Sequence, residues 1–334
     1  MLLAAGLLSM LAGGLAAAIR YAIVFPRQPL SGPVPPLDAE DLASAARLET
    51  HVRAVASRPH NLDYPDALEA AAVYIETTLR GFGLVPQLQV FSVLGHDVRN
   101  VEVVIEPPTG HAAEPGTYVI GAHYDAPDDS PGANDNGTGV AALLELARSL
   151  KDFAPTHRLR LVFFVNEEQP YGKTPDMGSY QHAKRLSDTG EPVAGMIALE
   201  TLGHFSDEPG SQSFPFPFGL LFPNRGNFVA FIGMLPARAL VHRALAAFRA
   251  TTPFPSIGGV APGFIEGIDL SDHWAYDHFG FPAMMVTDTA PFRNPYYHTP
   301  GDLPETVDYE NLARVTRGLE RTIRALTGGQ PQCT

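Results

Sequence analysis

Apolar side chains follow two periods along this chain, and the two periods separate helices from strands. Residues that recur every three or four positions indicate amphipathic helices, whereas short apolar runs between Gly, Pro or polar residues indicate strands. The predicted helices are 42–55, 67–79, 139–150, 179–186, 236–250 and a last helix that Asp308 can cap. The predicted strands are 85–93 and 98–105, which can form a hairpin, followed by 117–122, 159–165, 196–199 and 282–287.

Strands and helices alternate from residue 117 to the last helix, which is the order of an α/β fold. The strand at 159–165 is apolar at successive positions, as expected when helices cover both faces of a parallel sheet. We therefore predict an α/β sandwich around a largely parallel sheet. Because open sheets of this kind hold their sites at the carboxyl ends of the strands, residues that follow strands are the candidates for function.

The first 25 residues have a different pattern. Between Leu2 and Ile19 the only polar side chain is Ser9, so this segment is long enough for a signal-peptide core or a marginal membrane span. The Ala-Ala-Ala run at 16–18 would suit cleavage by a signal peptidase. However, no Lys or Arg precedes the segment, which is unfavourable for an ordinary exported topology. A buried helix is the alternative.

We predict a signal peptide or membrane anchor at 1–25, because helices this uniformly apolar are uncommon in globular domains. A Pro-rich linker at 26–37 would follow it. The protein would then be exported to the periplasm or the extracellular space, or it would associate with a membrane through this N-terminal segment.

Composition and charge narrow the classes of function. Of the 334 residues, 45% are hydrophobic and 18% are charged, which is enough apolar material for a sizeable core. The net charge of −13 argues against a nucleic-acid-binding surface, so we expect no nucleic-acid partner. The only cysteine is Cys333, which excludes an internal disulfide and a zinc site built from cysteines.

Polar residues suited to metal binding lie near the ends of predicted strands or in the loops that follow. Two imidazoles and several carboxylates form the ligand set of a pair of zinc-like ions that activates water. Each residue alone has an ordinary explanation, such as turn chemistry or a solvated strand end. Their joint occurrence in this order favours a metal site. The set comprises His123, Asp135, Glu167, Glu168, Glu200 and His298.

Two features of this set suit a two-metal hydrolase. Asp135 lies in the turn Gly132-Ala-Asn-Asp-Asn-Gly-Thr-Gly139, where the backbone can bend so that both carboxylate oxygens are available. Glu167 and Glu168 are adjacent at a strand end and therefore point in different directions. One of them can bind metal while the other faces the water and transfers its proton.

These motifs resemble the zinc-dependent aminopeptidases of the M28 peptidase family. The resemblance runs from about Val119 to the last helix. It covers His-Tyr-Asp, Gly-Ala-Asn-Asp-Asn-Gly-Thr-Gly, Asn-Glu-Glu-Gln, Met-Gly-Ser-Tyr, Leu-Glu-Thr-Leu-Gly, Ser-Asp-His-Trp and Tyr-His-Thr-Pro-Gly-Asp. It implies a single M28-like peptidase domain at 38–328, a three-layer α/β/α sandwich around a central mixed, largely parallel sheet of the phosphorylase/hydrolase-like kind.

The resemblance also implies roles for the candidate residues. Asp135 would bridge two zinc ions, and Glu167 would be the general base. Asp125, two residues after His123, would hold that imidazole and fix its tautomer. The Asp135–Asn136 peptide bond would be cis. The remaining ligands would be Glu168 and His298 at one ion, and His123 and Glu200 at the other.

The sequence departs from the family pattern at two places. Glu200 stands where Asp is more common, and its longer side chain could loosen the second ion. Binding of a single zinc in place of two is therefore an alternative. The segment 170–175, between the Glu pair and Met-Gly-Ser-Tyr, is longer than usual and could form part of a pocket wall.

Other residues support weaker hypotheses. Asp272, in Ser-Asp-His, would support a ligand or contact substrate, or it would cap a loop. The hydroxyl of Tyr296 or Tyr297 could assist a tetrahedral oxyanion, or both rings could wall the site. The stretch 204–231 holds seven Phe and four Pro and could line an apolar substrate pocket, act as a lid or pack in the core. Arg293 could pair with a substrate carboxylate, but we leave it out of the site.

The resulting functional hypothesis is a zinc-dependent aminopeptidase that removes N-terminal residues from peptides with a free amino terminus. A glutaminyl cyclase of related fold with a single zinc is the first alternative, and a catalytically silent relative is the second. The complete Gly-rich turn favours the peptidase. Competent side chains at all five ligand positions and at Glu167 argue against a loss of catalysis.

Overall fold

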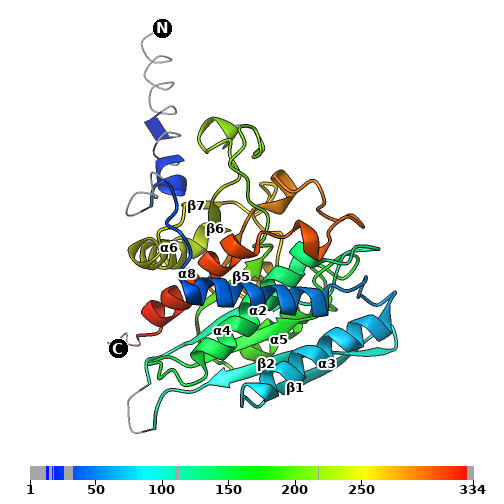
Figure 1. Cartoon of the computed structure of the whole chain (residues 1–334). Helices are drawn as coiled ribbons and strands as arrows, with labels where there is room; N and C mark the ends of the chain where they lie inside the picture. The colour runs from blue at the N-terminus through cyan, green and yellow to red at the C-terminus, as the bar shows by residue number, and fades with distance from the viewer. Residues whose placement is uncertain are drawn as a thin grey trace.

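The computed structural model describes residues 13–14, 17, 19–25, 33–109, 113–216 and 218–328. At its centre is an eight-stranded sheet with the strand order β1-β2-β4-β3-β5-β8-β6-β7 (Figure 1). The strands are β1 (Gln87–Val93), β2 (His96–Ile105), β3 (Thr117–His123), β4 (Leu159–Phe164), β5 (Val193–Glu200), β6 (Val229–Met234), β7 (Ser256–Ala261) and β8 (Ala283–Thr287).

The sheet is mixed, with a parallel centre. β4, β3, β5 and β8 are parallel to one another, and β6 and β7 form a parallel pair that runs antiparallel to β8. β1 and β2 form the predicted antiparallel hairpin, which is added to β4. Because β3, β4 and β5 are parallel neighbours, the residues at and just after their carboxyl ends meet at one edge of the sheet. The predicted α/β fold with a largely parallel sheet is confirmed.

Helices cover both faces of the sheet and complete three layers. One apolar cluster joins α2, α3, α4, α6 and α8 to the face that carries Tyr118 and Ile120. A second cluster joins α5 and α7 to the opposite face, which carries Val119 and Val162. The helices are α2 (Ala39–Val55), α3 (Pro65–Gly81), α4 (Gly139–Leu150), α5 (Gly178–Asp188), α6 (Arg238–Thr251), α7 (His273–His278) and α8 (Tyr309–Leu326).

Each element predicted from the apolar pattern is present, with small shifts at its ends. The Asp308 side chain caps α8 by accepting the N–H of Asn311 at 3.0 Å, as predicted. The pattern missed β6, β7 and α7. β7 contains Gly258 and Gly259, which contribute no side chain to an apolar run, and α7 has only six residues, too few to show a helical period.

The predicted signal peptide or anchor at 1–25 and the Pro-rich linker at 26–37 lie largely outside the described residues, as does Cys333. Within the described part of the chain, no helix has the length and apolar character needed to cross a membrane. Both N-terminal predictions stay predictions.

Candidate metal centre

The turn that carries Asp135 is held in place by contacts with the end of β5. The side-chain oxygen of Asn136 accepts the N–H groups of Gly139 and Thr201, and its amide donates to the carbonyl of Leu199 at 2.8 Å. The Asp135–Asn136 peptide bond is cis, which confirms that prediction. The turn is therefore fixed beside the residue that follows Leu199, which is Glu200.

Asp302 holds the same turn from the opposite side. Its two carboxylate oxygens accept the N–H groups of Asn134 at 2.9 Å and Asp135 at 3.0 Å. Asp302 is fully buried. Sequence reasoning did not select this residue, although it ends the Tyr-His-Thr-Pro-Gly-Asp motif that also contains His298. Its place in that motif is the feature of the sequence from which Asp302 could have been selected.

One oxygen of Asp135 faces a first group of candidate ligands. His123 ends β3 and Glu200 ends β5, so two neighbouring strands deliver them to the same edge. The Nε2 atom of His123 lies 3.4 Å from Oδ1 of Asp135 and 3.4 Å from Oε2 of Glu200. The hydroxyl of Ser271 donates to that same oxygen of Glu200 at 2.7 Å and orients it.

The other oxygen of Asp135 faces a second group. The Nε2 atom of His298 lies 3.1 Å from Oδ2 of Asp135 and 3.6 Å from Oε2 of Glu168. Glu168 follows β4, and His298 lies in the loop after β8. The structure thus brings together all five residues that the sequence predicts as ligands, with Asp135 between the two groups.

Unsatisfied polar atoms at this centre fit the binding of cations. Within the described part of the chain, Nε2 of buried His123 and both carboxylate oxygens of buried Asp135 make no hydrogen bond. Buried polar atoms without a partner are costly, and a divalent ion would satisfy them. In each group the imidazole and carboxylate atoms lie within 4.8 Å of one another. Histidine nitrogen with carboxylate oxygen is a donor set that zinc accepts.

The charge of the centre also favours the binding of cations. Burial would lower the pKa of His123, but Glu200, Asp125 and Asp135 outweigh burial and raise that pKa well above its usual value. Burial raises the pKa of Glu168, and the nearby charges of Asp135 and Glu167 raise it further. The carboxylates repel one another and attract positive charge, so the residues present fit bound cations.

Asp125 supports the centre through two sets of atoms. Its backbone carbonyl lies 3.1 Å from Nδ1 of His123, while its carboxylate is 3.6 Å from the same nitrogen. The carboxylate oxygens accept the N–H groups of Glu167 at 3.0 Å and Glu168 at 3.1 Å. Asp125 therefore contacts His123, as the sequence suggests, and it also fixes the backbone of the Glu pair.

Glu167 lies beside the two groups and is partly open to solvent. Its Oε2 atom is 3.9 Å from Nε2 of His123, and its side chain is 16% exposed. Burial raises the pKa of Glu167 well above its usual value; the charge of His123 opposes this rise, while Glu200 and Asp272 add to it. A carboxylate with a raised pKa next to a candidate metal site is suited to accept and then release a proton.

Asp272 lies fully buried near the first group. Both of its carboxylate oxygens lack a hydrogen bond within the described residues. Burial raises its pKa to about 7, against the charge of His123 and together with the charge of Glu200. The side chain of Asp272 therefore interacts with the ligands electrostatically. In the sequence, Asp272 directly precedes α7.

The two tyrosines before His298 differ in position. The ring of Tyr297 stacks on His298 with a centroid distance of 3.9 Å and lines the neighbouring pocket. Burial raises the pKa of Tyr297 above its usual value, so its hydroxyl keeps its proton. Tyr296 is 40% exposed and packs beside Gly301. Of the two, Tyr297 is the one that walls the site.

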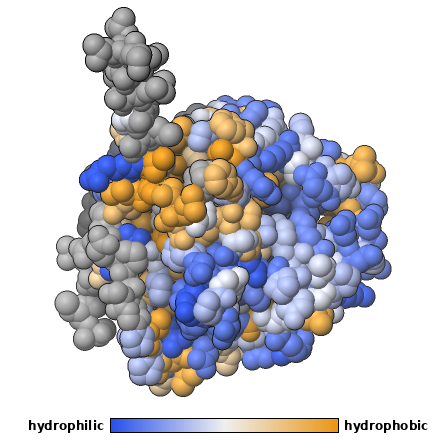
Figure 2. Space-filling view, turned by 90° about the horizontal axis from the view of Figure 1, so that it is seen from above, coloured by the Kyte–Doolittle hydropathy of each residue, from blue (hydrophilic) through white to orange (hydrophobic). Residues whose placement is uncertain are grey.

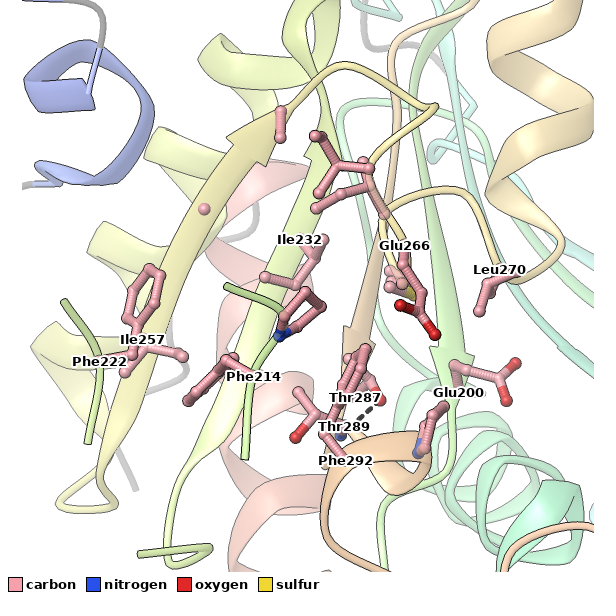
Figure 3. A pocket seen from close by; sticks show the side chains of 18 of the residues that line it. Glu200, Phe214, Phe222, Ile232, Ile257, Glu266, Leu270, Thr287, Thr289 and Phe292 are labelled. Carbon is pink, nitrogen blue, oxygen red and sulfur yellow. Dashed lines mark hydrogen bonds between the residues drawn. The ribbon is translucent and has the colours of Figure 1, made fainter. Parts of the chain in front are cut away.

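A mostly apolar pocket adjoins the metal centre. It lies over β6, β7 and β8 and reaches Glu200 (Figure 3). Figure 3 shows Phe214, Phe222 and Ile257 on one side of the pocket and Glu200 on the other. The predicted apolar wall from 204–231 is therefore present in part, because Phe214 and Phe222 line the pocket while Phe228 and Phe231 are buried in the core.

Arg293 secures the loop that carries Phe214, a role that sequence reasoning missed. It is 9% exposed, and its guanidinium donates to the carbonyls of Gly226 and Phe228, each at 3.0 Å. The segment 170–175 does not line the pocket, but its Lys173 forms a 2.8 Å ion pair with Asp269 in the loop after β7. Both contacts act through the loops that border the pocket.

Comparisons with known proteins agree with this geometry. Residues 100–323 match the model of peptidase family M28. The uncharacterized protein YfbL of Escherichia coli is 36% identical over 288 residues, which cover 83% of this chain and 87% of YfbL. A probable zinc metalloprotease of Pyrenophora tritici-repentis is 28% identical over 240 residues. That alignment covers 64% of this chain and 48% of the relative, so the chain spans about half of that protein's length.

Solved structures share the fold at low identity. BSAP, a zinc aminopeptidase from Bacillus subtilis, superposes with a TM-score of 0.65 at 15% identity, covering 87% of this chain and 96% of BSAP. A glutaminyl cyclase from Fimbriiglobus ruber superposes with a TM-score of 0.62 at 19% identity, covering 90% and 99%. Since the family model spans most of the sheet and every residue of the two ligand groups, the chain belongs to peptidase family M28.

Proposed function

We propose that this M28 peptidase is a zinc-dependent aminopeptidase that removes the first residue from peptides with a free amino terminus. The observation that carries the proposal is the paired site, in which the two oxygens of Asp135 face two separate imidazole–carboxylate groups. Zinc is supported by the donor set and by relatives that are named zinc aminopeptidase or zinc metalloprotease.

The residues would hold two ions, bridged by Asp135. His123 and Glu200 would bind one ion, and His298 and Glu168 would bind the other. Bound divalent cations supply Lewis acidity to the scissile carbonyl and lower the pKa of water. Asp125 and Asp302 would keep the ligands oriented through the backbone contacts described above, as outer contacts do in metal sites.

Glu167 would act as the general base. Its partly open carboxylate can take a proton from the attacking water and give it to the leaving amine. Its raised pKa suits both halves of that transfer. Tyr297, which lines the pocket next to His298 and keeps its proton, would wall the reacting carbonyl on one side.

The first residue of the substrate would enter the apolar pocket. Glu200 belongs both to the metal centre and to the pocket lining, so the pocket begins where the scissile bond would lie. The carboxylates of the centre would attract the free amino group of the peptide. An apolar side chain would bury its surface against Phe214, Phe222 and Ile257.

A panel of aminoacyl and peptide substrates tests this function. The zinc-loaded protein should release free amino acid. This release should stop after treatment with a chelator and resume when zinc is restored. Glu167→Gln should retain its metal content, measured by mass spectrometry, and lose hydrolysis. Hydrolysis by Glu167→Gln at the wild-type rate would refute the assigned base, and absence of release from any substrate would refute the aminopeptidase.

A glutaminyl cyclase is the second candidate, because the F. ruber cyclase shares the fold over 90% of this chain. The two ligand groups around Asp135 favour the peptidase over an enzyme with one zinc. Peptides that begin with Gln, placed in the same panel, separate the two. Pyroglutamate without free glutamine would indicate the cyclase, and neither product with metal bound would indicate a catalytically silent relative.

A further inference from the structure

Two loops that wall the apolar pocket also carry large apolar side chains that are open to solvent. The loop 213–223 has the sequence Ser-Phe-Pro-Phe-Pro-Phe-Gly-Leu-Leu-Phe-Pro, without a charged residue. The loop 262–270 follows β7. Residues of both loops line the pocket, so their exposed side chains lie around its mouth. These side chains, called the apolar rim, are Phe216 (89% exposed), Leu220 (79%), Leu221 (45%), Phe264 (85%) and Leu270 (41%).

Residues 21–24 lie beside this rim. Ile23 lines the same pocket. Arg238 on α6 donates to the carbonyls of Tyr21 at 2.8 Å and Val24 at 3.2 Å, and its guanidinium lies 4.3 Å from the ring centroid of Tyr21.

The rim and Ile23 border the same pocket and therefore lie on one face of the molecule. Figure 2 shows apolar residues gathered on one part of this face, while hydrophilic residues cover much of the remainder. Monomeric soluble proteins seldom expose several large apolar side chains together unless the surface has a partner. Of the two acidic residues in the loop 262–270, Glu266 lies among the pocket residues in Figure 3, and Asp269 forms an ion pair with Lys173.

The sequence that leads up to Ile23 indicates the partner. Between Leu2 and Ile19 the only polar side chain is Ser9, a length and composition suited to the hydrocarbon of a bilayer. Arg20, which is exposed, would then lie at the level of the lipid headgroups. Since Ile23, which follows this sequence, lies at the same pocket as the rim, a second protein would have to cover the rim beside a segment suited to lipid.

We propose that the apolar rim docks on a lipid bilayer, with Phe216 and Phe264 inserted at the interface on the same side as the N-terminal segment. Phenylalanine and leucine at loop tips bury their surface among the acyl chains near the headgroups. Several such side chains together with an apolar segment attach a protein stably to a membrane, whereas a single weak membrane-binding feature binds reversibly. The pocket mouth then faces the membrane surface. This docking does not depend on the proposed catalytic activity.

Tryptophan fluorescence in the full-length chain tests the docking. The protein has a single tryptophan, Trp274, so Trp274→Phe gives a background in which one new tryptophan reports alone. Phe216→Trp and Phe264→Trp place it on the rim. Leu94→Trp is the matched control, because Leu94 is 80% exposed and lies between β1 and β2. Each variant is bound to phosphatidylcholine–phosphatidylglycerol vesicles with or without bromine on the acyl chains.

We expect emission at positions 216 and 264 to shift to shorter wavelength on the vesicles and to be quenched several-fold by brominated lipid, with no quenching at position 94. Either rim position reports independently if the other variant fails to fold. Vesicle-bound protein that is unquenched at both rim positions would overturn the proposal, because the N-terminal segment alone would then hold the protein. A concentration-dependent blue shift at position 216 without vesicles would also overturn it, in favour of a second copy of the chain.

Discussion

Asp302 accepts the backbone N–H of Asp135 at 3.0 Å, across 167 residues of sequence. The contact joins the loop after His298 to the turn that carries the proposed bridging ligand. The neighbouring N–H of Asn134 donates to the other carboxylate oxygen at 2.9 Å. The two hydrogen bonds that this one carboxylate accepts thus set the position of Asp135, although Asp302 contacts neither imidazole.

Asp302→Asn should weaken metal binding and leave the fold intact. An amide offers one acceptor where the carboxylate offers two, so one backbone N–H at the turn loses its partner. Loss of such an outer contact lowers metal affinity by about 10- to 100-fold. Zinc affinity can be measured by competition with a chromophoric chelator. Asp308→Asn, which alters only the cap of α8, should keep the wild-type affinity; equal losses in both variants would show a general effect on folding.

Short local motifs explain why the ligands could be predicted while their supports could not. His123, Asp135 and the Glu pair follow strands that apolar runs reveal, and their residue types indicate metal chemistry. Asp302 and Arg293 act on backbone groups that lie far away in sequence. A backbone N–H or carbonyl is the same at every position, so the sequence carries no sign of which distant residue will bind it.

His298→Ala should remove one of the two proposed ions and spare the other. His298 contacts Asp135 and Glu168, whereas His123 and Glu200 form the other group. The metal content of the purified variant, measured by mass spectrometry, should fall by half relative to the zinc-loaded wild type. Tyr296→Phe is the control, because Tyr296 is exposed and outside both groups. An unchanged metal content in His298→Ala would exclude His298 as a ligand.

The fold was predictable wherever apolar side chains mark a strand, and β7 shows where that signal fails. A Cβ on Gly258 would lie 2.6 Å from a methyl group of Leu245 and 2.9 Å from the ring of Phe25. The close approach of α6 therefore requires glycine at a position where a strand usually shows a branched side chain. The tertiary contact that makes this segment a strand also removes the pattern by which a strand is recognised.

Glu102 should make the stability of the fold depend on pH in the acidic range. It is buried on β2, 2.5 Å from Arg160 and 2.7 Å from Arg185. Burial would raise the pKa of Glu102, but contact with His182 and the charges of the two arginines outweigh burial and hold that pKa well below its usual value of 4.5. Its stabilisation is thus complete above the unfolded-state pKa and is lost as the pH falls through the lower folded-state pKa.

Urea unfolding of Glu102→Gln and wild type at a series of pH values measures this contribution. At pH 7 the variant should be less stable by about 3 kcal/mol, as expected when one member of a buried ion pair is removed. The difference should shrink below about pH 4.5, where the wild type starts to lose its own contribution. Glu106→Gln, which alters a solvent-exposed pair with Arg158, should cost at most about 1 kcal/mol. A pH-independent difference for Glu102→Gln would contradict the assignment.

Gly259→Leu should change which first residue the enzyme accepts. Gly259 lines the apolar pocket, and a Cβ there would meet only a side-chain atom of Ile232, at 3.4 Å, so the first atom of a side chain is accommodated without displacing the backbone. The added isobutyl group would occupy space that we assign to the first residue of the substrate. Hydrolysis of Leu- and Phe-p-nitroanilide should fall by about tenfold or more in kcat/KM, the order expected for lost apolar contacts, while Ala-p-nitroanilide changes little.

Gly259→Ala provides the graded control for that result. Its single methyl group should leave the kcat/KM for the leucine substrate near the wild-type value and reduce that for the larger phenylalanine substrate more. Because the metal ligands are untouched, metal content and the rate on the alanine substrate should stay constant through the series. A parallel loss on all three substrates would mean that residue 259 acts on the metal centre, and the pocket over β7 would then not be the site of the first residue.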